Sequence, residues 1–532
     1  MANNFSQPSV MKHLFSQAPK ADLPRSSFQR DSGLKTAFDA GLLVPVYLDE
    51  ILPGDSVNMD STGFLRMATP IYPIFDNLFV DMFWFFCPNR LVFDNWVKLM
   101  GEQDNPDDSI DFTIPRVDPA TMVVQEGDLG DYFGLPIADY TATTISSLPF
   151  KMYSLCWNQW FRDQNLQDSR PVDTGDTAID YADYSTLARR GKRFDYFTSA
   201  LPNPQKGVEV TLPLGTDAPL LPDATTGKWF EGATAGTPFD MVEKLGDPGN
   251  MGYNPSSALV DPDTVGITAY VDLSNATAVT INQMRLAITT QQFFEADARG
   301  GTRYTELNYQ HFGVSNPDAR LQRVELLAVN STPIRSQAVS ATVTVPTSDA
   351  NGTTMGDPGA TMTGLFKSGF TKSFTEHGYL FALCSVRADL NYQSGVEKHW
   401  SREDRFDFYF PTFAHLGEAP ILNKEIYFQN TGSSGDDDLV FGYNEVWSEY
   451  KYKTSQITNQ MRSQAATSLD AWHLAQEFTT LPLLDDTFIQ ENPPMDRVIA
   501  ATDEPDFICD FYFKNKSARV MPVYSVPGLT RF

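Results

Sequence analysis

The stretch Leu78–Cys87 constrains the fold more than any other part of the sequence, because its side chains are apolar on both alternating faces. One face carries Leu78, Val80, Met82, Trp84 and Phe86. The other carries Phe79, Phe83 and Phe85, with Asp81 as the only charge. A strand that is apolar on both sides has to be covered on both sides, which predicts a place inside a sandwich or barrel. The run is about half the roughly 20 residues that a membrane-spanning helix needs, so we do not interpret it as a membrane span.

The period of the apolar residues changes just after this strand. Val92, Trp96 and Leu99 fall at i, i+4 and i+7, which is helical spacing. The sequence therefore predicts a short amphipathic helix, with Asn89 as its N-cap.

A longer helix is predicted over Leu148–Gln167. Ser146 or Ser147 can cap it, and Pro149 suits its first turn. Its apolar stripe is more typical of core packing than of a surface on which bases stack; the stripe consists of Tyr153, Cys156, Trp157, Trp160 and Phe161.

Short segments with strand character recur along the chain, separated by turns rich in Pro and Gly. They predict strands at Leu42–Tyr47, Val57–Met59, Phe64–Met67, Leu321–Val329, Tyr379–Asp389 and Phe507–Phe513. Such close spacing is typical of an antiparallel sandwich or barrel. We also expect helices at Ile281–Ala298 and Trp472–Phe478, and a loop rich in Thr, Gly and Ala at Ser340–Gly369.

The totals limit the class of protein. A chain of 532 residues can form two to four ordinary domains, or one large domain with insertions. A net charge of −27 argues against a general nucleic-acid binder. The four cysteines lie far apart and form no CxxC pair, which favours a reducing compartment. The first residues lack the pattern of a signal peptide, so we expect the protein to be made and used in a cytosol.

The segment from Asn203 to Thr280 differs in composition from the rest of the chain. It is rich in Gly and Pro, lacks Arg, His and Cys, and carries three cations against ten acids. Val208–Leu214 and Val265–Leu273 still have strand character. We interpret the segment as a small β-rich insertion that leaves the main body and returns to it.

Motifs of catalysis and of cofactor binding are absent from the sequence. There is no GxSxG, GxxxxGK[ST] or GxGxxG pattern. The six histidines are isolated, without an HExxH or HxH pair to ligate a metal. The acidic runs at Asp173–Asp183 and Asp436–Asp438 do not have the spacing of an EF-hand. We therefore predict that the protein is not an enzyme and has no cofactor or metal site.

The two ends of the chain are basic, whereas the part between them carries a net charge of −34. Residues 1–35 hold five cations and two acids, and residues 514–532 hold four cations and no acid. Cationic arms of this kind can reach phosphates from an otherwise acidic body. The candidate nucleic-acid-binding residues are Lys12, Lys20, Arg25, Arg30, Lys35, Lys514, Lys516, Arg519 and Arg531.

Several long segments resemble the major capsid proteins of the gokushoviruses, the small single-stranded DNA phages of the Microviridae. They include FSQAPKADLPRSSFQRDSGLKTAFDAGLLVPVYLDEILPGD (Phe15–Asp55) and ATPIYPIFDNLFVDMFWFFCPNRLVFDNWVKLMGEQ (Ala68–Gln103). FGYNEVWSEYKYK, WHLAQEF and the ending ARVMPVYSVPGLTRF also resemble that family. The resemblance extends over the body, but not over Asn203–Thr280 or Ser340–Gly369.

This resemblance implies an all-β fold with helical insertions, namely an eight-stranded viral jelly roll with long loops between strands. It implies a structural protein that assembles with itself into a T=1 icosahedral shell around circular single-stranded DNA. The insertion would form a protrusion at the threefold axes and take part in host attachment. Further implied partners are an internal scaffold, a DNA pilot protein, a small DNA-binding protein and a receptor on the host surface. The expected location is the virion, assembled in the bacterial cytoplasm, with no membrane insertion.

The expected organisation has five parts. They are a basic N-terminal arm (1–35), the first part of the body (36–202), the β-rich insertion (203–280), the second part of the body (281–513) and a basic C-terminal stretch (514–532). The alternative class is an all-β carbohydrate-binding protein or glycosidase. A glycosidase needs two facing carboxylates, and 67 acidic residues leave such a pair open. A non-viral DNA-binding module is a third class, against which the acidic body argues.

Overall fold

The computed structural model describes residues 25–207, 230–231, 240–243, 251–254, 268–269, 281–299, 310–312, 322–340, 358–430 and 435–524. The chain divides into two compact units. The first contains Met1–Asn203 and Val314–Phe532, and the second contains Pro204–Gly313. Each unit is described by itself.

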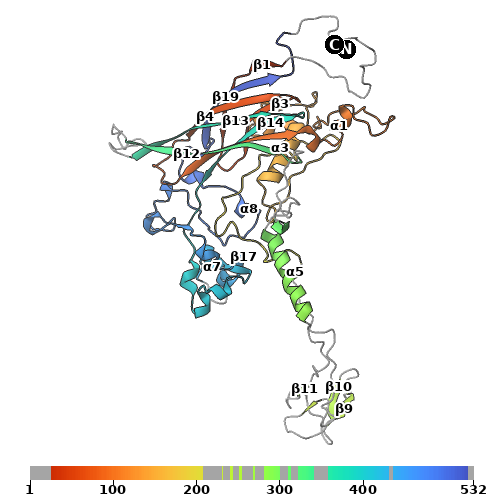
Figure 1. Ribbon diagram of the computed structural model, residues 1–532. Helices are drawn as coiled ribbons and strands as arrows, with labels where there is room; N and C mark the ends of the chain where they lie inside the picture. Colours follow the sequence, from red (N-terminus) through yellow and green to blue (C-terminus); the bar gives the residue numbers. More distant parts are fainter. Residues whose placement is uncertain are drawn as a thin grey trace, which may run out of the picture. The chain divides into compact units, whose positions relative to one another are not determined.

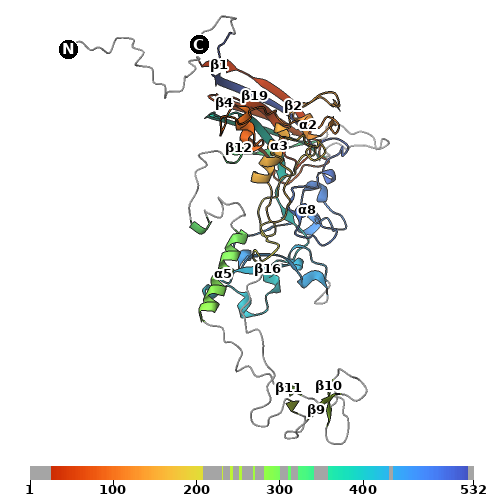
Figure 2. The same cartoon turned by 90° about the vertical axis from the view of Figure 1, so that its right-hand side faces the viewer.

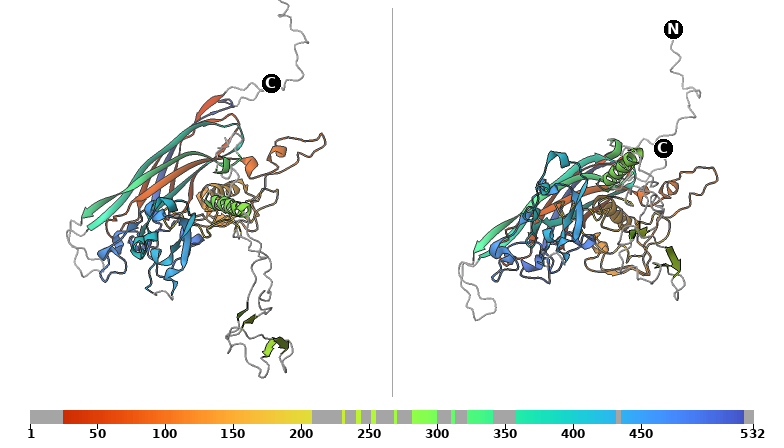
Figure 3. Two further views of the ribbon diagram at one scale, coloured as in Figure 1. Left: turned by 60° about the horizontal axis from the view of Figure 1, so that its bottom comes forward. Right: turned by 90° about the horizontal axis from the view of Figure 1, so that it is seen from below.

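One large antiparallel sheet organises the first unit (Figure 1). Its strands are β1 (Ser26–Gln29), β2 (Ser32–Phe38), β3 (Val44–Ile51), β4 (Ser56–Met67), β5 (Leu78–Pro88), β12 (Glu325–Ser340), β13 (Pro358–Ser373), β14 (Gly378–Ala388) and β19 (Phe507–Arg519). They pair in the order β1-β19-β4-β13-β12-β5-β14-β3, and β2 also pairs with β19. The long strands twist and curl together, as Figure 3 shows.

In the part of the chain that the structure describes, nine strands fill eight positions in this sheet. Strand β1 pairs with residues 516–519 of β19, and β2 pairs with residues 507–513 of the same strand. The other edge of β19 is occupied by β4 along nearly its whole length, so β1 and β2 lie end to end along one edge. The predicted all-β class is confirmed, and the curled eight-position sheet fits the jelly roll implied by the resemblance.

Strand β5 lies between β12 and β14 and is buried on both faces, as predicted. Trp84 and its neighbours on one face belong to the core between the two halves of the curled sheet. Phe83, Phe85 and Cys87 pack into a second core, together with helix α3 (Leu148–Trp160). Covering by sheet on one side and by a helix on the other explains why both faces of the strand are apolar.

The segment after β5 is less helical than its spacing predicts. Asn89–Leu91 is a single 3-10 turn, and α1 is confined to Trp96–Leu99. Asn89 lies inside the 3-10 turn rather than at its N-cap, which is Pro88. Val92 and Trp96 are nonetheless buried in the second core, so the spacing correctly identified the buried side.

Helix α3 begins where the sequence predicts and ends seven residues earlier, at Trp160. Pro149 occupies its first turn. Ser147 does not cap the helix with its side chain, because its hydroxyl donates to the Pro115 carbonyl at 2.9 Å. The sequence predicts that the aromatic stripe of this helix packs into the core. This prediction is confirmed for Tyr153 and Trp157, which are buried.

Three other predictions of local structure are wrong in extent or type. The two short strands predicted between Val57 and Met67 are one continuous strand, β4. The loop predicted over Ser340–Gly369 contains most of strand β13. Trp472–Phe478 is not a helix: a 3-10 turn covers Asp470–Trp472, His473 is extended, and the residues that follow have no regular secondary structure. There the guanidinium of Arg497 donates to the carbonyls of His473 and Ala475, which bonds this backbone to a neighbouring segment instead of to itself.

The first unit also contains shorter elements. Among its described residues, the other strands are β6 (Val123–Val124), β7 (Ala138–Asp139), β15 (Asn391–Tyr392), β16 (Glu418–Leu422), β17 (Val440–Glu445) and β18 (Ser455–Gln456). The other α-helices described there are α2 (Leu129–Tyr132), α7 (Asn423–Ile426) and α8 (Asp486–Ile489). No helix among the described residues is long and apolar enough to cross a membrane.

The second unit contains helix α5 (Ile281–Arg299), which confirms the predicted helix (Figure 2). Two strand pairs are described within it: β8 (Phe230–Glu231) with β11 (Thr268–Ala269), and β9 (Asp240–Glu243) with β10 (Met251–Asn254). The predicted strand at Val208–Leu214 lies outside the described residues.

Candidate nucleic-acid interface

The outer face of the sheet around β19 carries two of the four cations that the sequence analysis assigned to the C-terminal stretch, Lys514 and Lys516. Strand β19 alternates strictly, because successive side chains of a strand point to opposite faces. Phe507, Cys509, Phe511 and Phe513 are buried in the core. The exposed side chains are Ile508, Asp510, Tyr512, Lys514 and Lys516. Lys514 and Lys516 therefore belong to a sheet surface and not to a separate tail.

The pairing registers place further cations beside them, because residues opposite each other in an antiparallel pair lie on the same face. Tyr512 is opposite Thr62 of β4, and Thr62 is opposite Lys367 of β13. Arg66 of β4 is opposite Thr363, which is itself opposite Arg335 of β12. We call this surface the basic sheet face. Its six cations are Lys35, Arg66, Arg335, Lys367, Lys514 and Lys516.

Acidic residues balance only part of this charge. Lys35 forms an ion pair of 2.8 Å with Asp510, and both side chains are more than half exposed, so the pair is weak. Asp60 lies opposite Lys514, and Asp31 accepts a hydrogen bond from the Tyr512 hydroxyl at 3.2 Å. Within the described ranges, the other five cations of the face have no ion pair or side-chain hydrogen bond. Six cations against three carboxylates leave an excess of positive charge on a chain whose net charge is −27.

Apolar and aromatic side chains lie between these cations and are unusually exposed for their size. Phe64 is 48% exposed, Tyr512 46%, Ile508 57% and Leu365 65%. Phe64 stands opposite both Asp510 and Leu365, in the middle of the face. Cations that contact phosphates, combined with rings on which bases stack, are what single-stranded nucleic acid requires of a binding surface.

Three of the nine predicted site residues make structural bonds instead. Arg30 forms two bonds of 2.7 Å to the Asp49 carboxylate, which raises the pKa of Arg30. Arg25 donates to the hydroxyl of Ser56 at 2.8 Å and to the carbonyl of Gly54. Arg519 pairs with the buried Asp55 at 3.1 Å and donates to the carbonyl of Glu50. These arginines attach β1 and the end of β19 to the sheet, and carboxylates already match the charges of Arg30 and Arg519.

The remaining predicted residues divide into two groups. Lys35, Lys514 and Lys516 lie on the basic sheet face. Lys12, Lys20 and Arg531 lie outside the described residues. Nucleic-acid binding by any of these residues stays a prediction.

Arg66, Arg335 and Lys367 are the cations that the sequence analysis missed. They are dispersed along the chain and belong to no charged cluster, so a search for runs of charge cannot find them. A partial signal exists in β4, where Phe64 and Arg66 alternate with the buried Leu65 and Met67. Only the register between strands shows that they share a face with Lys514.

Other kinds of site have less support among the described residues. No group of three or more His, Cys, Asp or Glu side chains in the described ranges is arranged to hold a metal ion. All four cysteines are buried and unpaired with one another. Burial raises the pKa of Cys87 and of Cys156, so neither thiol is activated as a nucleophile.

Comparison with known proteins gives one consistent result. A family model described as "Capsid protein (F protein)" matches residues 16–529. Capsid protein VP1 of Bdellovibrio phage phiMH2K is 42% identical over 533 residues, which cover 97% of this chain and 98% of the relative. Capsid protein VP1 of Chlamydia phage 1 is 40% identical, and the match covers 100% of both chains. Capsid protein VP1 of Spiroplasma virus 4 is 34% identical, again over 100% of both chains.

Proposed function

Since this chain belongs to the capsid protein (F protein) family of the Microviridae and is a structural major capsid protein, we propose that its copies close into a T=1 icosahedral shell around circular single-stranded DNA. In this proposal the basic sheet face is turned inward and contacts the genome. The observation that carries the proposal is the concentration of six cations and four exposed apolar side chains on one sheet surface.

The physical reason is repulsion between the protein and its cargo. A subunit with a net charge of −27, repeated around a closed shell, would repel a polyanion. Cations therefore have to be concentrated where the strand approaches the protein. Contacts to phosphates carry no base information, so we expect binding to be independent of sequence.

The first prediction concerns the cations of β13 and β19. Replacing Lys367, Lys514 and Lys516 by Gln should reduce the DNA packaged per particle and weaken the dependence of DNA release on salt. Each phosphate contact on a single strand contributes about −0.7 to the slope of log K against log salt, so the loss of three should lower its magnitude by about 2. Packaged DNA is measured by the absorbance ratio of purified particles, and the slope by DNA release in a salt series.

A matched variant separates this effect from a general change of charge. Arg405, Lys451 and Arg462 are exposed cations of the same unit that lie away from the sheet face. Replacing all three by Gln alters the net charge equally and should leave packaging and slope unchanged. Equal loss in both variants, or no loss in either, would contradict a genome-binding role for the face.

The N-terminal arm and the C-terminus can add to this contact. In the proposal, Lys12, Lys20 and Arg531 act as the predicted cationic arms. A small DNA-binding protein, a DNA pilot protein and an internal scaffold are further proposed partners, and assembly is proposed to take place in the bacterial cytoplasm. The alternative of a glycosidase has no support from relatives whose names describe capsid proteins.

We also propose host attachment for the segment 203–280, supported by its acidity and its richness in Gly and Pro, which suit a solvated projection.

The second prediction tests this role. Joining Leu201 to Ile281 through a short Gly-Ser linker should still permit assembly but should reduce adsorption to host cells by more than tenfold. Particle formation is measured by sedimentation, and adsorption by the phage remaining free after mixing. Normal adsorption of the shortened particles would exclude the attachment role, whereas a failure to form particles would assign the segment to shell contacts.

A further inference from the structure

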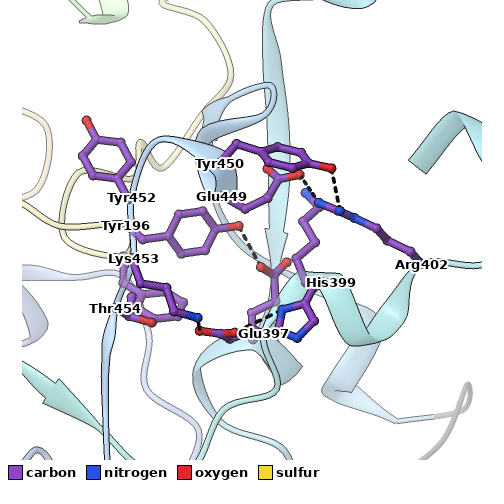
Figure 4. A pocket seen from close by; sticks show the side chains of 12 residues that line it. Tyr196, Glu397, His399, Arg402, Glu449, Tyr450, Tyr452, Lys453 and Thr454 are labelled. Atoms are coloured by element: carbon purple, nitrogen blue, oxygen red, sulfur yellow. Dashed lines mark hydrogen bonds and ion pairs between the residues drawn. The ribbon is translucent and has the colours of Figure 1, made fainter. Parts of the chain in front are cut away.

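A cavity of about 200 Å³ lies among the loops that follow β14 (Figure 4). It is lined by Glu397, Lys398, His399 and Arg402 from the segment around a 3-10 turn (Lys398–Ser401), and by Glu449, Tyr450, Tyr452 and Lys453 from the segment after β17. Tyr196, Phe197 and Glu425 form its inner wall. All of these residues belong to the first unit. None of them lies on the basic sheet face, so the cavity is unrelated to the proposed genome contact.

The charged side chains of the cavity neutralise one another. Arg402 pairs with Glu449 at 3.1 Å and donates to the Tyr450 hydroxyl at 2.6 Å. Glu397 pairs with both His399, at 3.1 Å, and Lys453. The charged groups that line the cavity are therefore three carboxylates, three permanent cations and one histidine. The carboxylates belong to Glu397, Glu425 and Glu449, and the cations to Lys398, Arg402 and Lys453. Such a cavity gives little net attraction to an anion or a cation, because its carboxylates and its permanent cations are equal in number.

The same side chains keep hydrogen-bonding capacity in both directions. A guanidinium offers five N–H donors, and a carboxylate offers about four acceptor positions. The side chain of Arg402 is only 10% exposed. Its Nε–H is buried and has no hydrogen-bond partner among the described residues. Glu425 is 5% exposed and accepts from the Tyr196 hydroxyl at 2.7 Å, and its burial raises the pKa of its carboxyl group. A ligand with many hydroxyl groups can both donate to and accept from such a wall.

Aromatic rings supply the apolar part of the wall. Tyr450 is 54% exposed and Tyr452 is 45% exposed, which is high for rings beside a cavity. In Figure 4 the Tyr450 and Tyr452 rings lie in the upper part of the group, and the Tyr196 ring lies below them. An aromatic face packs well against a flat ligand face that carries only C–H groups, while its hydroxyl remains available for hydrogen bonds.

A second cavity of about 260 Å³ adjoins the first, and the two share Lys398, Arg402, Glu425 and Glu449. Together they reach the size range of small-molecule sites, which is roughly 300–1,000 Å³. The shared residues form a polar partition between the two chambers. This arrangement suits two linked rings better than one compact ligand.

We propose that this pair of cavities binds a neutral carbohydrate, with one sugar ring against Tyr450 and Tyr452 and the polar partition bonding its hydroxyl groups. A sugar combines C–H faces that stack on aromatic rings with vicinal hydroxyls that fit paired carboxylates and guanidinium groups. Charge balance excludes strong selection for a phosphorylated, acidic or amino sugar. The proposal goes beyond the proposed function, since shell closure, genome contact and the attachment role of segment 203–280 do not require it, and no described residue of that segment lines either cavity.

The third prediction tests this site with neutral methyl glycosides of glucose, galactose, mannose and N-acetylglucosamine, and with their neutral disaccharides. Glucuronate, glucosamine and glucose 6-phosphate are the charged counterparts. Binding is measured by saturation-transfer difference NMR, on intact particles and on unassembled subunits. We expect at least one neutral sugar to bind, and its charged counterpart to bind at least tenfold more weakly. Tyr452→Ala should weaken binding at least tenfold.

Matched variants make the result specific. Phe194→Ala removes a ring that is 73% exposed and lies outside both cavities, so it should bind sugar like the parent protein. Tyr450→Phe is a second, milder change, because it removes only the hydroxyl that accepts from Arg402. The proposal is overturned if no neutral sugar binds to subunits or particles, if charged sugars bind more tightly, or if Tyr452→Ala and Phe194→Ala behave alike. A failure to assemble is detected separately by sedimentation, so it cannot be confused with a failure to bind sugar.

Discussion

Replacing Asp81 by Ala is expected to lower the free energy of unfolding by about 3–5 kcal/mol, the cost of breaking a buried ion pair from one side. Asp81 is the single charge of strand β5, and its side chain is 1% exposed. Its carboxylate pairs with Arg387 of β14 at 2.9 Å and with Arg190. Both arginine side chains are largely buried, at 16% and 14% exposed. Removal of the acid leaves two guanidinium groups in the protein interior without their partner.

The environment of Arg387 explains the size of this effect. Burial, followed by the neighbouring charge of Arg190, lowers the pKa of Arg387 to about 10, while Asp81 acts in the opposite direction. The cationic form is therefore already disfavoured in the folded protein, and Asp81 is what offsets that penalty. The measurement is equilibrium unfolding of unassembled subunits in urea at pH 7.

Two controls define the interpretation of the Asp81 variant. Asp510→Ala breaks the exposed pair with Lys35 and should cost only about 0–1 kcal/mol. The triple variant Asp81→Val, Arg190→Met, Arg387→Met removes all three charges together and should recover most of the stability, since apolar replacements of buried ion pairs are often neutral. If Asp81→Ala costs no more than Asp510→Ala, the cluster is hydrated in solution and the prediction is wrong.

Replacing Trp84 by Ala should also cost about 3–5 kcal/mol, as large-to-small changes of core aromatics do. Trp84 is fully buried at the centre of β5. Its ring centroid lies 5.4 Å from those of Tyr47 and Phe370, and 6.1 Å from that of Phe513 in an edge-to-face arrangement. These rings come from four strands, so a cavity at Trp84 loosens both halves of the curled sheet at once. The change is measured by the same unfolding experiment and by the yield of assembled particles.

Trp84→Phe should cost much less, within about 1.5 kcal/mol, because a ring still fills most of the space. The Nε1–H of Trp84 has no hydrogen-bond partner among the described residues, so the phenylalanine also removes an unsatisfied donor. Trp400→Ala provides the surface comparison: Trp400 is 74% exposed, and its replacement should change stability by less than about 0.5 kcal/mol. A loss at Trp400 as large as at Trp84 would contradict the assignment of the core.

The failed loop prediction at Ser340–Gly369 shows how glycine can mislead. Glycines usually interrupt strands, yet Gly369 lies within β13 because a Cβ there would collide with the backbone carbonyl of Met59 in β4. Gly63 of β4 likewise makes room for the ring of Phe366. The composition reflects close packing of two strands, and composition alone cannot distinguish that from a loop.

The periodicity of apolar residues was sufficient to identify a strand or helix where the burial of each residue depends only on its position in that element. It identified the doubly buried strand β5 and the helix at Ile281–Arg299, and it placed the start of α3 correctly. The same information placed Lys514 and Lys516 near the C-terminus, but treated them as a tail beyond the last strand. The continuation of β19 to Arg519 depends on pairing with β4 and β1, which lie more than 400 residues earlier in the chain.

The sequence by itself determined the family, the all-β class and the buried strand at its centre, because motifs and side-chain alternation are properties of contiguous residues. Only the tertiary structure decided which cations share a surface, since Arg66, Lys367 and Lys514 meet through strand register and not through proximity in sequence. It also decided that Arg25, Arg30 and Arg519 are bonded to the sheet, and that Tyr196 lines a cavity with residues 397–454. Register and loop packing are set by contacts between distant segments, and the free energy of those contacts is not encoded in any one segment.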